Sequence, residues 1–187
     1  NSNREAGYLY HHGLRVASIA ESLLRELEPV DVAASPDDLY AAALFHDVGK
    51  GFTAHHEIGA AIIPHLLSAY AEVLDIDRIS HIVSRHCLRD ATKEEALDVA
   101  VVQDADLLDH FGAQEVWLLL RQFSSRGFSQ TEGAEYAQGD ERAERISRCR
   151  GLLNLESARV RFDARVEFAD GYFRRLAEEN GLGVPET

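Results

Sequence analysis

Apolar residues recur every three or four positions along most of the chain, whereas stretches in which β-branched and polar residues alternate are almost missing. This spacing puts the apolar side chains on one face of an α-helix and does not fit the two-residue period of a strand. The pattern therefore predicts an all-α protein. The expected helices span residues 8–28, 35–49, 56–71, 75–86, 92–111, 113–123, 141–153 and 155–179.

Local signals mark where some of these helices begin. Ser35 can cap the second helix, and Pro36 has the backbone geometry of a first helical position. Thr92 and Glu95 form a capping-box pattern before an apolar run. Residues 124–140, in contrast, are rich in Gly, Ser and Gln and show little apolar periodicity. We expect them to form a long surface loop, which is a candidate lid.

Length and composition are those of one globular domain. The chain has 187 residues, 45% of them hydrophobic and 27% charged, which excludes disorder for most of its length. We expect a single domain over residues 1–187, with a core at about 8–123 and C-terminal helices at 141–180. Two cysteines, Cys87 and Cys149, are too few for a disulfide framework, and the first residues lack a signal-peptide pattern. A cytoplasmic location is the resulting expectation.

The charge balance limits the class of partner. The chain has 19 Lys and Arg against 32 Asp and Glu, a formal net charge of −13, which opposes sequence-independent binding to nucleic acid or to an anionic membrane. No apolar run approaches the roughly 20 residues of a membrane span. Any bound phosphate must therefore be held by a local cluster of side chains. The oligomeric state stays open, because Trp117 and the leucines near it suit either a core or an interface.

Four polar residues occupy apolar stripes where a hydrocarbon side chain is expected: His12, His46, His86 and Asp104. A buried carboxylate without a partner costs on the order of several kcal/mol, and neutral imidazoles cannot balance its charge. A divalent cation satisfies both kinds of side chain at once. One inward-facing histidine alone is usually a hydrogen-bonded core residue. Several on separate helices, with Asp47 directly after His46, predict a metal site.

The same residues resemble the H…HD…D signature of the HD-domain superfamily of metal-dependent phosphohydrolases, here His12, His46-Asp47 and Asp104. Three longer segments are similar to family motifs: His12–Val16 to H-x-x-R-V, Ala42–Lys50 to A-x-L-x-H-D-I-G-K, and Val102–Asp109 to Q-D-A-D-x-L-D. The resemblance covers about residues 8–123 and points to the bacterial HD hydrolases. It implies an HD-domain helical bundle with additional C-terminal helices, in which His12, His46, Asp47 and Asp104 bind the metal ion.

Some members of the superfamily hold two metal ions through two further histidines. His55, in the segment His-His-Glu-Ile-Gly-Ala, and His86 resemble those residues. One ion is the expectation and a second stays open, because His55 follows His46 by only nine residues and His56 could take its place. With one ion, His86 would contact the substrate phosphate or relay a proton. The neighbouring acidic residues Asp106 and Asp109 are interpreted as outer groups or as a solvated face.

The resemblance implies a phosphohydrolase that cleaves a phosphate ester or anhydride in a nucleotide or another small phosphorylated metabolite. Metal-bound hydroxide would attack phosphorus, Asp47 would orient or deprotonate the water, and His86 or Lys50 would stabilise the developing charge. Imidazole and carboxylate ligands favour Mn, Fe, Co, Ni or Zn over Ca. A local positive rim for the phosphate is expected from Arg15, Lys50, Arg85 and Arg89.

Two other functions stay open. An HD-type di-iron oxygenase would need both His55 and His86 as ligands. A non-catalytic module would use the metal ion only to tie its helices together. The number of bound ions, the dependence on oxygen and the activity of an Asp47→Ala variant separate the three possibilities.

Overall fold

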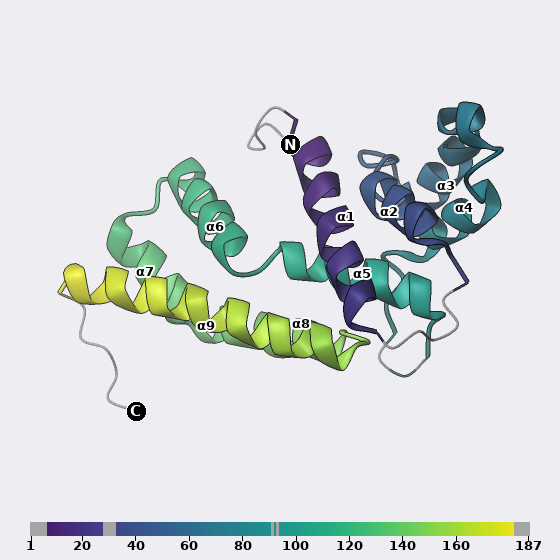
Figure 1. The fold of residues 1–187 in the computed structure, drawn as a ribbon. Coiled ribbons are helices and arrows are strands. Elements are labelled where there is room, and N and C mark those ends of the chain that lie inside the picture. Colours follow the sequence, from purple (N-terminus) through teal and green to yellow (C-terminus); the bar gives the residue numbers. More distant parts are fainter. Residues whose placement is uncertain (1–6, 28–32, 91, 93, 182–187) are drawn as a thin grey trace. The chain divides into compact units, whose positions relative to one another are not determined.

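A computed structural model describes residues 7–27, 33–90, 92 and 94–181, and these residues form helices with no strand among them (Figure 1). The helices are α1 (Tyr8–Glu26), α2 (Pro36–Phe45), α3 (His55–Leu66), α4 (Ile76–Arg85), α5 (Leu97–Asp109), α6 (Ala113–Arg126), α7 (Gln130–Gln138), α8 (Asp140–Gly151) and α9 (Glu156–Glu179). A short 3-10 turn, η1, covers Ser68–Tyr70. The predicted all-α fold is confirmed. None of the helices in the described part combines the length and apolar character of a membrane span.

The contacts between helices divide the chain into two compact units. The N-terminal unit contains α1 to α5 together with residues 152–158, and the C-terminal unit contains α6 to α8 and α9 from residue 159 onward. All of the motif residues singled out in the sequence lie in the N-terminal unit. The length predicts that the two units belong to a single domain, and this stays a prediction.

Close helix packing in the N-terminal unit depends on one glycine. There α1 packs against α2 and α5, and α3 packs against α4. The apolar stripe of α1 buries Val16 and Leu23 completely. A Cβ atom on Gly13 would lie 2.3 Å from the backbone oxygen of Leu44, which is far inside van der Waals contact. Gly13 therefore lets α1 and α2 meet directly beside His12.

Residues 124–140 do not form the loop that their composition predicts. They begin as the last turn of α6 and continue as α7. Ser129 caps α7, because its hydroxyl accepts a hydrogen bond from the Glu132 backbone while the Glu132 carboxylate accepts one from the Ser129 backbone. The buried face of α7 consists of the small residues Gly133, Ala134 and Ala137. Such a face carries little apolar signal, so the helical period is weak in the sequence.

The helix expected over residues 92–111 begins later, at Leu97. Thr92 donates hydrogen bonds to the Asp90 carboxylate through its backbone N–H and its hydroxyl, and Glu95 forms an ion pair with Arg85 of α4. The capping box expected from Thr92 and Glu95 is therefore wrong. Both side chains have partners outside the helix that they were expected to cap.

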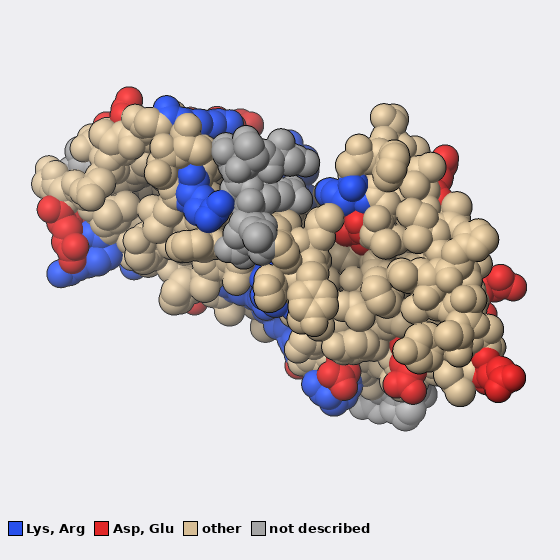
Figure 2. All heavy atoms as spheres, turned by 90° about the horizontal axis from the view of Figure 1, so that it is seen from above, with Lys and Arg blue, Asp and Glu red and all other residues tan. Residues whose placement is uncertain are grey.

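Charged side chains do not gather on the face of the molecule shown in Figure 2, where acidic and basic residues are scattered between wide uncharged areas. The net charge of −13 is therefore not concentrated in one patch on that face. Among the described residues visible there, no continuous basic stripe of the kind that follows a nucleic-acid backbone is present.

A buried ion cluster adjoins the apolar interior of the C-terminal unit. That interior contains Val116, Leu119, Phe123, Ala137, Ala169 and Phe173. Beside it, Glu115 is only 1% exposed and accepts hydrogen bonds from Arg142 Nε and Nη2, at 3.0 and 3.2 Å, and from Arg145. Arg142 is also buried and donates to Asp170. Because the charges of Glu115 and Arg142 are removed from water, each depends on its partners.

We expect Glu115→Ala to lower the free energy of unfolding of the C-terminal unit by about 3 kcal/mol or more, because Arg142 then loses its buried counter-charge. Asp163→Ala is the control, since it removes an exposed ion pair with Arg150 and should cost no more than about 1 kcal/mol. Urea unfolding followed by the fluorescence of Trp117 in α6 measures both. Equal losses in the two variants would contradict the dependence on burial.

Candidate metal centre

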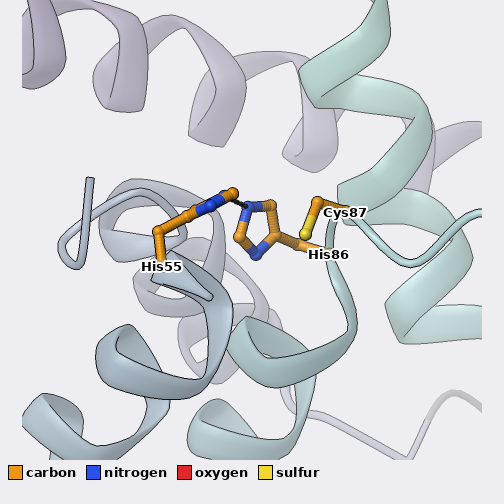
Figure 3. A group of neighbouring side chains, drawn as sticks. All are labelled: His55, His86 and Cys87. Carbon is orange, nitrogen blue, oxygen red and sulfur yellow. Dashed lines mark hydrogen bonds between the residues drawn. The ribbon is translucent and has the colours of Figure 1, made fainter. Parts of the chain in front are cut away.

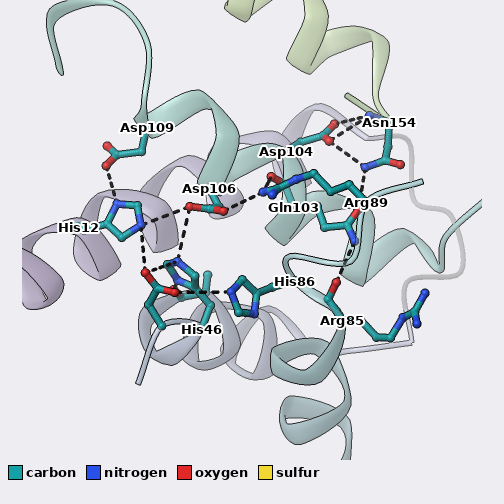
Figure 4. A network of polar contacts seen from close by, with 12 residues as sticks. His12, His46, Arg85, His86, Arg89, Gln103, Asp104, Asp106, Asp109 and Asn154 are labelled. Carbon is teal, nitrogen blue, oxygen red and sulfur yellow. Dashed lines mark hydrogen bonds and ion pairs between the residues drawn. The ribbon is translucent and has the colours of Figure 1, made fainter. Parts of the chain in front are cut away.

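Helix ends in the N-terminal unit bring imidazoles and carboxylates together. They are His12 of α1, His46 and Asp47 after α2, His55 at the start of α3, His86 after α4, and Asp106 of α5. His12, His46 and His86 are at most 1% exposed, and Asp47 is 7% exposed. In Figure 4 the labelled side chains of His12, His46 and Asp106 point toward one another. The polar atoms therefore face one another in a space largely closed to water.

A tight turn after α2 brings His55 into the group. A Cβ atom on Gly49 would lie 2.2 Å from the His55 backbone oxygen and 2.6 Å from the Gly59 nitrogen, so only glycine permits this approach of the turn to α3. Ala54, just before α3, has a positive φ of 55°, which turns the chain sharply into the helix. The short connection between His46 and His55 is therefore long enough to place His55 beside Asp47.

Three of the imidazoles are oriented by hydrogen bonds at Nδ1. His46 Nδ1 lies 2.7 Å from the Ala43 oxygen, and His86 Nδ1 lies 2.7 Å from the Val83 oxygen. A backbone oxygen only accepts, so both Nδ1 atoms donate, and a neutral imidazole with its proton on Nδ1 carries a lone pair on Nε2. His12 Nδ1 lies 2.7 Å from Asp109 Oδ2. Such outward bonds are typical of histidines that hold a metal ion.

The first donor group consists of His12 Nε2, His46 Nε2, Asp106 Oδ1 and Asp47 Oδ2. Asp106 Oδ1 lies 3.2 Å from His12 Nε2 and 3.6 Å from His46 Nε2. Asp47 Oδ2 lies 4.0 and 3.8 Å from the same two nitrogens. His46 Nε2 is buried and has no hydrogen-bond partner among the described residues. A buried lone pair facing carboxylate oxygens fits a cation between them, so these residues suit the metal ion that the motifs imply.

The second donor group consists of Asp47 Oδ1, His55 Nε2 and His86 Nε2. Asp47 Oδ1 lies 3.6 Å from His55 Nε2 and 3.5 Å from His86 Nε2. The two Nε2 atoms are 3.3 Å apart (Figure 3). The two oxygens of Asp47 thus face different donor groups. His56, the alternative to His55, instead faces Glu57 at 3.9 Å and belongs to neither group.

The pKa values show a field that favours positive charge at the first donor group. Burial by itself lowers the pKa of His12, but the carboxylates of Asp106 and Asp109 outweigh it and raise the pKa to about 9. Burial by itself raises the pKa of Asp106, yet His12, His46 and Arg89 hold it well below the usual value. The carboxylates that stabilise a proton on His12 would also stabilise a divalent cation.

Basic residues expected at a rim are instead paired with the carboxylates of the site. Arg15 donates to both oxygens of Asp109, at 2.8 and 3.0 Å, and Arg89 Nη2 donates to Asp106 Oδ2 at 2.7 Å. Lys50 Nζ lies 3.0 Å from each Asp47 oxygen. These pairs fix how the carboxylates point. The fourth expected residue, Arg85, pairs with Glu95.

The structure does not bring Asp104, which the sequence predicts as a metal ligand, to either donor group. Its carboxylate accepts hydrogen bonds from the Asn154 N–H at 3.0 and 3.1 Å, from Asn154 Nδ2 at 2.9 Å and from the Leu155 N–H at 2.8 Å. Figure 4 shows Asp104 directed at Asn154, away from His12 and His46. Burial raises the pKa of Asp104 despite these bonds. Asp104 therefore fastens the start of α9 to α5.

The apolar stripe of α5 does not mark the face that meets the histidines, because that helix is buried on both faces. Its buried residues run from Asp98 through Ala105 and include Leu108 and Asp109, so apolar neighbours do not identify the face that meets the histidines. Asp106, interpreted from the sequence as an outer group or part of a solvated face, instead faces His12 Nε2 in the first donor group, whereas Asp109 contacts His12 at Nδ1, as an outer group does. These two residues are three positions apart, so both lie on one side of the helix. That pairing was the available signal.

Comparisons with known proteins agree with this geometry. The HD domain model matches residues 9–110. Among solved structures, Bacillus subtilis YpgQ is 24% identical with a TM-score of 0.68, and the match covers 93% of this chain and 89% of that chain. Its complex with ADP is 21% identical with a TM-score of 0.62, covering 90% and 87%. An HD-superfamily hydrolase from Bacillus thuringiensis is 18% identical with a TM-score of 0.65, covering 97% and 91%.

At these identities the solved structures show a shared fold. The sequence matches no curated protein. The family model, however, spans more than half of the chain and includes His12, His46, Asp47 and Asp106. On that match, the chain belongs to the HD domain family.

Proposed function

We propose that this protein is a metal-dependent phosphohydrolase, with His12, His46, Asp47 and Asp106 as ligands of its principal metal ion. The observation that carries the proposal is the buried Nε2 of His46, which has no partner among the described residues and faces oxygens of Asp47 and Asp106. A site that held only hydrogen bonds would leave this nitrogen unsatisfied. The mixed imidazole and carboxylate donors suit Mn, Fe, Co, Ni or Zn.

A divalent ion in such a site lowers the pKa of a coordinated water and polarises a phosphoryl oxygen. The residues of the chain supply the orientation that this chemistry needs. Asp47 presents ionised oxygens that accept hydrogen bonds from water, because His86, His46 and Lys50 lower its pKa despite burial. Lys50 is partly exposed, with 34% of its side chain open to solvent, and carries positive charge toward a phosphate. His86 directs Nε2 toward Asp47 Oδ1, at 3.5 Å.

The proposed substrate is a nucleotide or another small phosphorylated metabolite. The ADP complex of Bacillus subtilis YpgQ, whose fold is similar, supports the inclusion of nucleoside diphosphates and triphosphates in a substrate screen. The net charge of −13 supports a small substrate over a polymeric nucleic acid. Recognition of the phosphate then depends on the local cations, of which Lys50 both contacts the candidate ligand Asp47 and has 34% of its side chain open to solvent.

The second donor group supports a second cation position that shares Asp47 with the first. Both positions together would also suit a di-iron oxygenase, so this function is the second candidate. The two are separated by assaying phosphate release in air and under anaerobic conditions with Mn²⁺ or Co²⁺. Equal phosphate release in both supports the hydrolase, whereas a product that forms only with Fe²⁺ and oxygen would favour the oxygenase.

Asp47→Ala should reduce both metal affinity and phosphate release by more than about 100-fold, since removal of an outer hydrogen-bonding partner alone typically costs 10- to 100-fold. A screen of nucleotides and phosphomonoesters with Mn²⁺ or Co²⁺ measures turnover, and circular dichroism checks the fold. Asp37→Ala, at an exposed position in the first turn of α2, is the control. Full turnover by Asp47→Ala would leave only a structural role for the ion.

Asp106→Asn and Asp104→Asn should have opposite effects. Asp106→Asn removes a candidate ligand and should abolish tight metal binding in calorimetric titration. Asp104→Asn should keep metal affinity within a few-fold, but it should lower the free energy of unfolding by about 1–3 kcal/mol because three backbone and side-chain donors lose an ionised acceptor. If Asp104→Asn lost the metal and Asp106→Asn retained it, the assignment of the fourth ligand would be reversed.

Asp109→Asn should weaken metal binding by roughly 10- to 100-fold, because Asp109 orients His12 without contacting the ion. Calorimetric titration with Mn²⁺ measures the affinity. Arg15→Gln tests the next contact outward, since Arg15 holds Asp109 in place, and should give a smaller loss in the same direction. An unchanged affinity in Asp109→Asn would show that His12 does not depend on this hydrogen bond.

A further inference from the structure

A groove of about 580 Å³ lies in the C-terminal unit, and none of the residues that line it belongs to the candidate metal centre. Its walls are residues of α8 and α9, together with the last residues of α7. The volume lies within the roughly 300–1,000 Å³ that is typical of small-molecule sites. The proposed hydrolysis uses none of these residues, so it gives the groove no role.

The two long walls of the groove are antiparallel helices. Arg150, near the end of α8, pairs with Asp163 in the first half of α9, and Arg142, near the start of α8, pairs with Asp170 further along α9. At about 1.5 Å per residue, the part of α8 between these two arginines spans about 12 Å. The groove therefore runs lengthwise between α8 and α9 and suits an elongated ligand.

The middle of the groove is apolar. Its apolar lining consists of Ala143 and Ile146 of α8, Val166 and Phe173 of α9, and Ala137 of α7. Phe173 is buried, whereas Ala143 is exposed and Ile146 and Val166 are half-buried. Part of this apolar surface is therefore in contact with water, and a hydrocarbon ligand in the groove would remove it from water, which is favourable.

Arg142 fixes the walls of the groove. This buried side chain donates from Nε and Nη2 to Glu115 of α6, and from Nη1 to the backbone oxygen of Ala137 at 3.1 Å and to Asp170 at 2.5 Å. Its contacts join α6, α7, α8 and α9, and its charge is balanced by two carboxylates. Arg142 therefore holds the shape of the groove and leaves the binding of an anion to other residues.

Arg174 differs from the other arginines that line the groove. Arg150 donates to both oxygens of Asp163, at 2.7 and 2.8 Å, so its charge is also balanced. Arg174 is exposed and forms no hydrogen bond or ion pair with another described residue. It lies one helical turn beyond Asp170, at the end of the groove away from Arg150. One guanidinium at that end can therefore receive an anion.

We propose that this groove binds an aliphatic carboxylate, with the carboxylate on Arg174 and the hydrocarbon chain along Ala143, Ile146 and Val166. A guanidinium presents paired N–H donors that match the two oxygens of a carboxylate. One arginine without a counter-charge balances the single charge of a carboxylate, whereas a phosphate carries about −1.5 to −2 at neutral pH. The net charge of −13 disfavours anions at most other places on the protein.

Calorimetric titration of the full-length protein with octanoate tests the inference. Octanoate should bind at one site, and 1-octanol, which has the same chain without the charge, should bind at least about tenfold more weakly. Acetate, which has the charge without the chain, should show no saturation below about 1 mM. Absence of octanoate binding below about 1 mM would overturn the site. Equal affinity for octanoate and 1-octanol would overturn the role of the arginine.

Variants locate the binding in the groove. Arg174→Gln should weaken octanoate binding at least about tenfold, and Arg174→Lys should restore part of the loss. Arg148→Gln is the matched control, because Arg148 is an exposed arginine of α8 outside the groove lining, and should change affinity by less than about twofold. Ala143→Phe should block the chain, whereas Ala164→Phe, at an exposed position of α9 outside the lining, should not. Circular dichroism checks the fold of each variant.

The remaining outcomes decide the head group and separate this inference from the proposed function. Tighter binding of octyl phosphate than of octanoate would overturn the assignment of a carboxylate. Equal losses in Arg174→Gln and Arg148→Gln, or full binding by Ala143→Phe, would place the ligand elsewhere and overturn the groove as its site. The titrations are made without added metal ions, so a failure here leaves the hydrolase proposal standing, and a failure of metal binding leaves the groove unaffected.

Discussion

The arrangement of the site depends on one carboxylate. Asp47 turns one oxygen toward His12 and His46 and the other toward His55 and His86, so a single side chain joins four imidazoles from four segments. Burial disfavours its negative charge, and the surrounding histidines and Lys50 more than compensate. Positive charge, as protons or as bound cations, is therefore required wherever this carboxylate is ionised.

The backbone brings these groups within reach through two glycines. Gly13 allows α1 to contact the end of α2, and Gly49 allows the turn after α2 to contact the start of α3. A side chain at either position would push apart the segments that carry His12, His46 and His55. The Nδ1 hydrogen bonds then fix the direction of the rings, with Asp109 and two backbone oxygens as the acceptors. Packing sets the positions of the donors, and hydrogen bonding sets their directions.

The cations near the site act mainly on its carboxylates. Arg15 holds Asp109, Arg89 holds Asp106 and Lys50 holds Asp47. Only Lys50 among these combines contact with a candidate ligand and substantial exposure, with 34% of its side chain open to solvent against 15% for Arg89. An acidic protein can therefore present positive charge to a phosphate at one place without a basic surface. The buried ion cluster of the C-terminal unit follows the same rule, since Glu115 is held by two arginines.

The sequence alone predicted the all-α fold, because a three- to four-residue apolar period has no other regular solution. It also singled out His12 and His46, which interrupt the apolar stripe of α1 and the apolar run that ends α2, and Asp47 directly after His46. It could not identify Asp106, because α5 is buried on both faces and its pattern of apolar neighbours is the same toward Asp104. Nor could it identify α7, whose buried face is made of glycine and alanine. Only the tertiary structure decided these two points, since the face of a fully buried helix, and the packing of small side chains, depend on what lies opposite them.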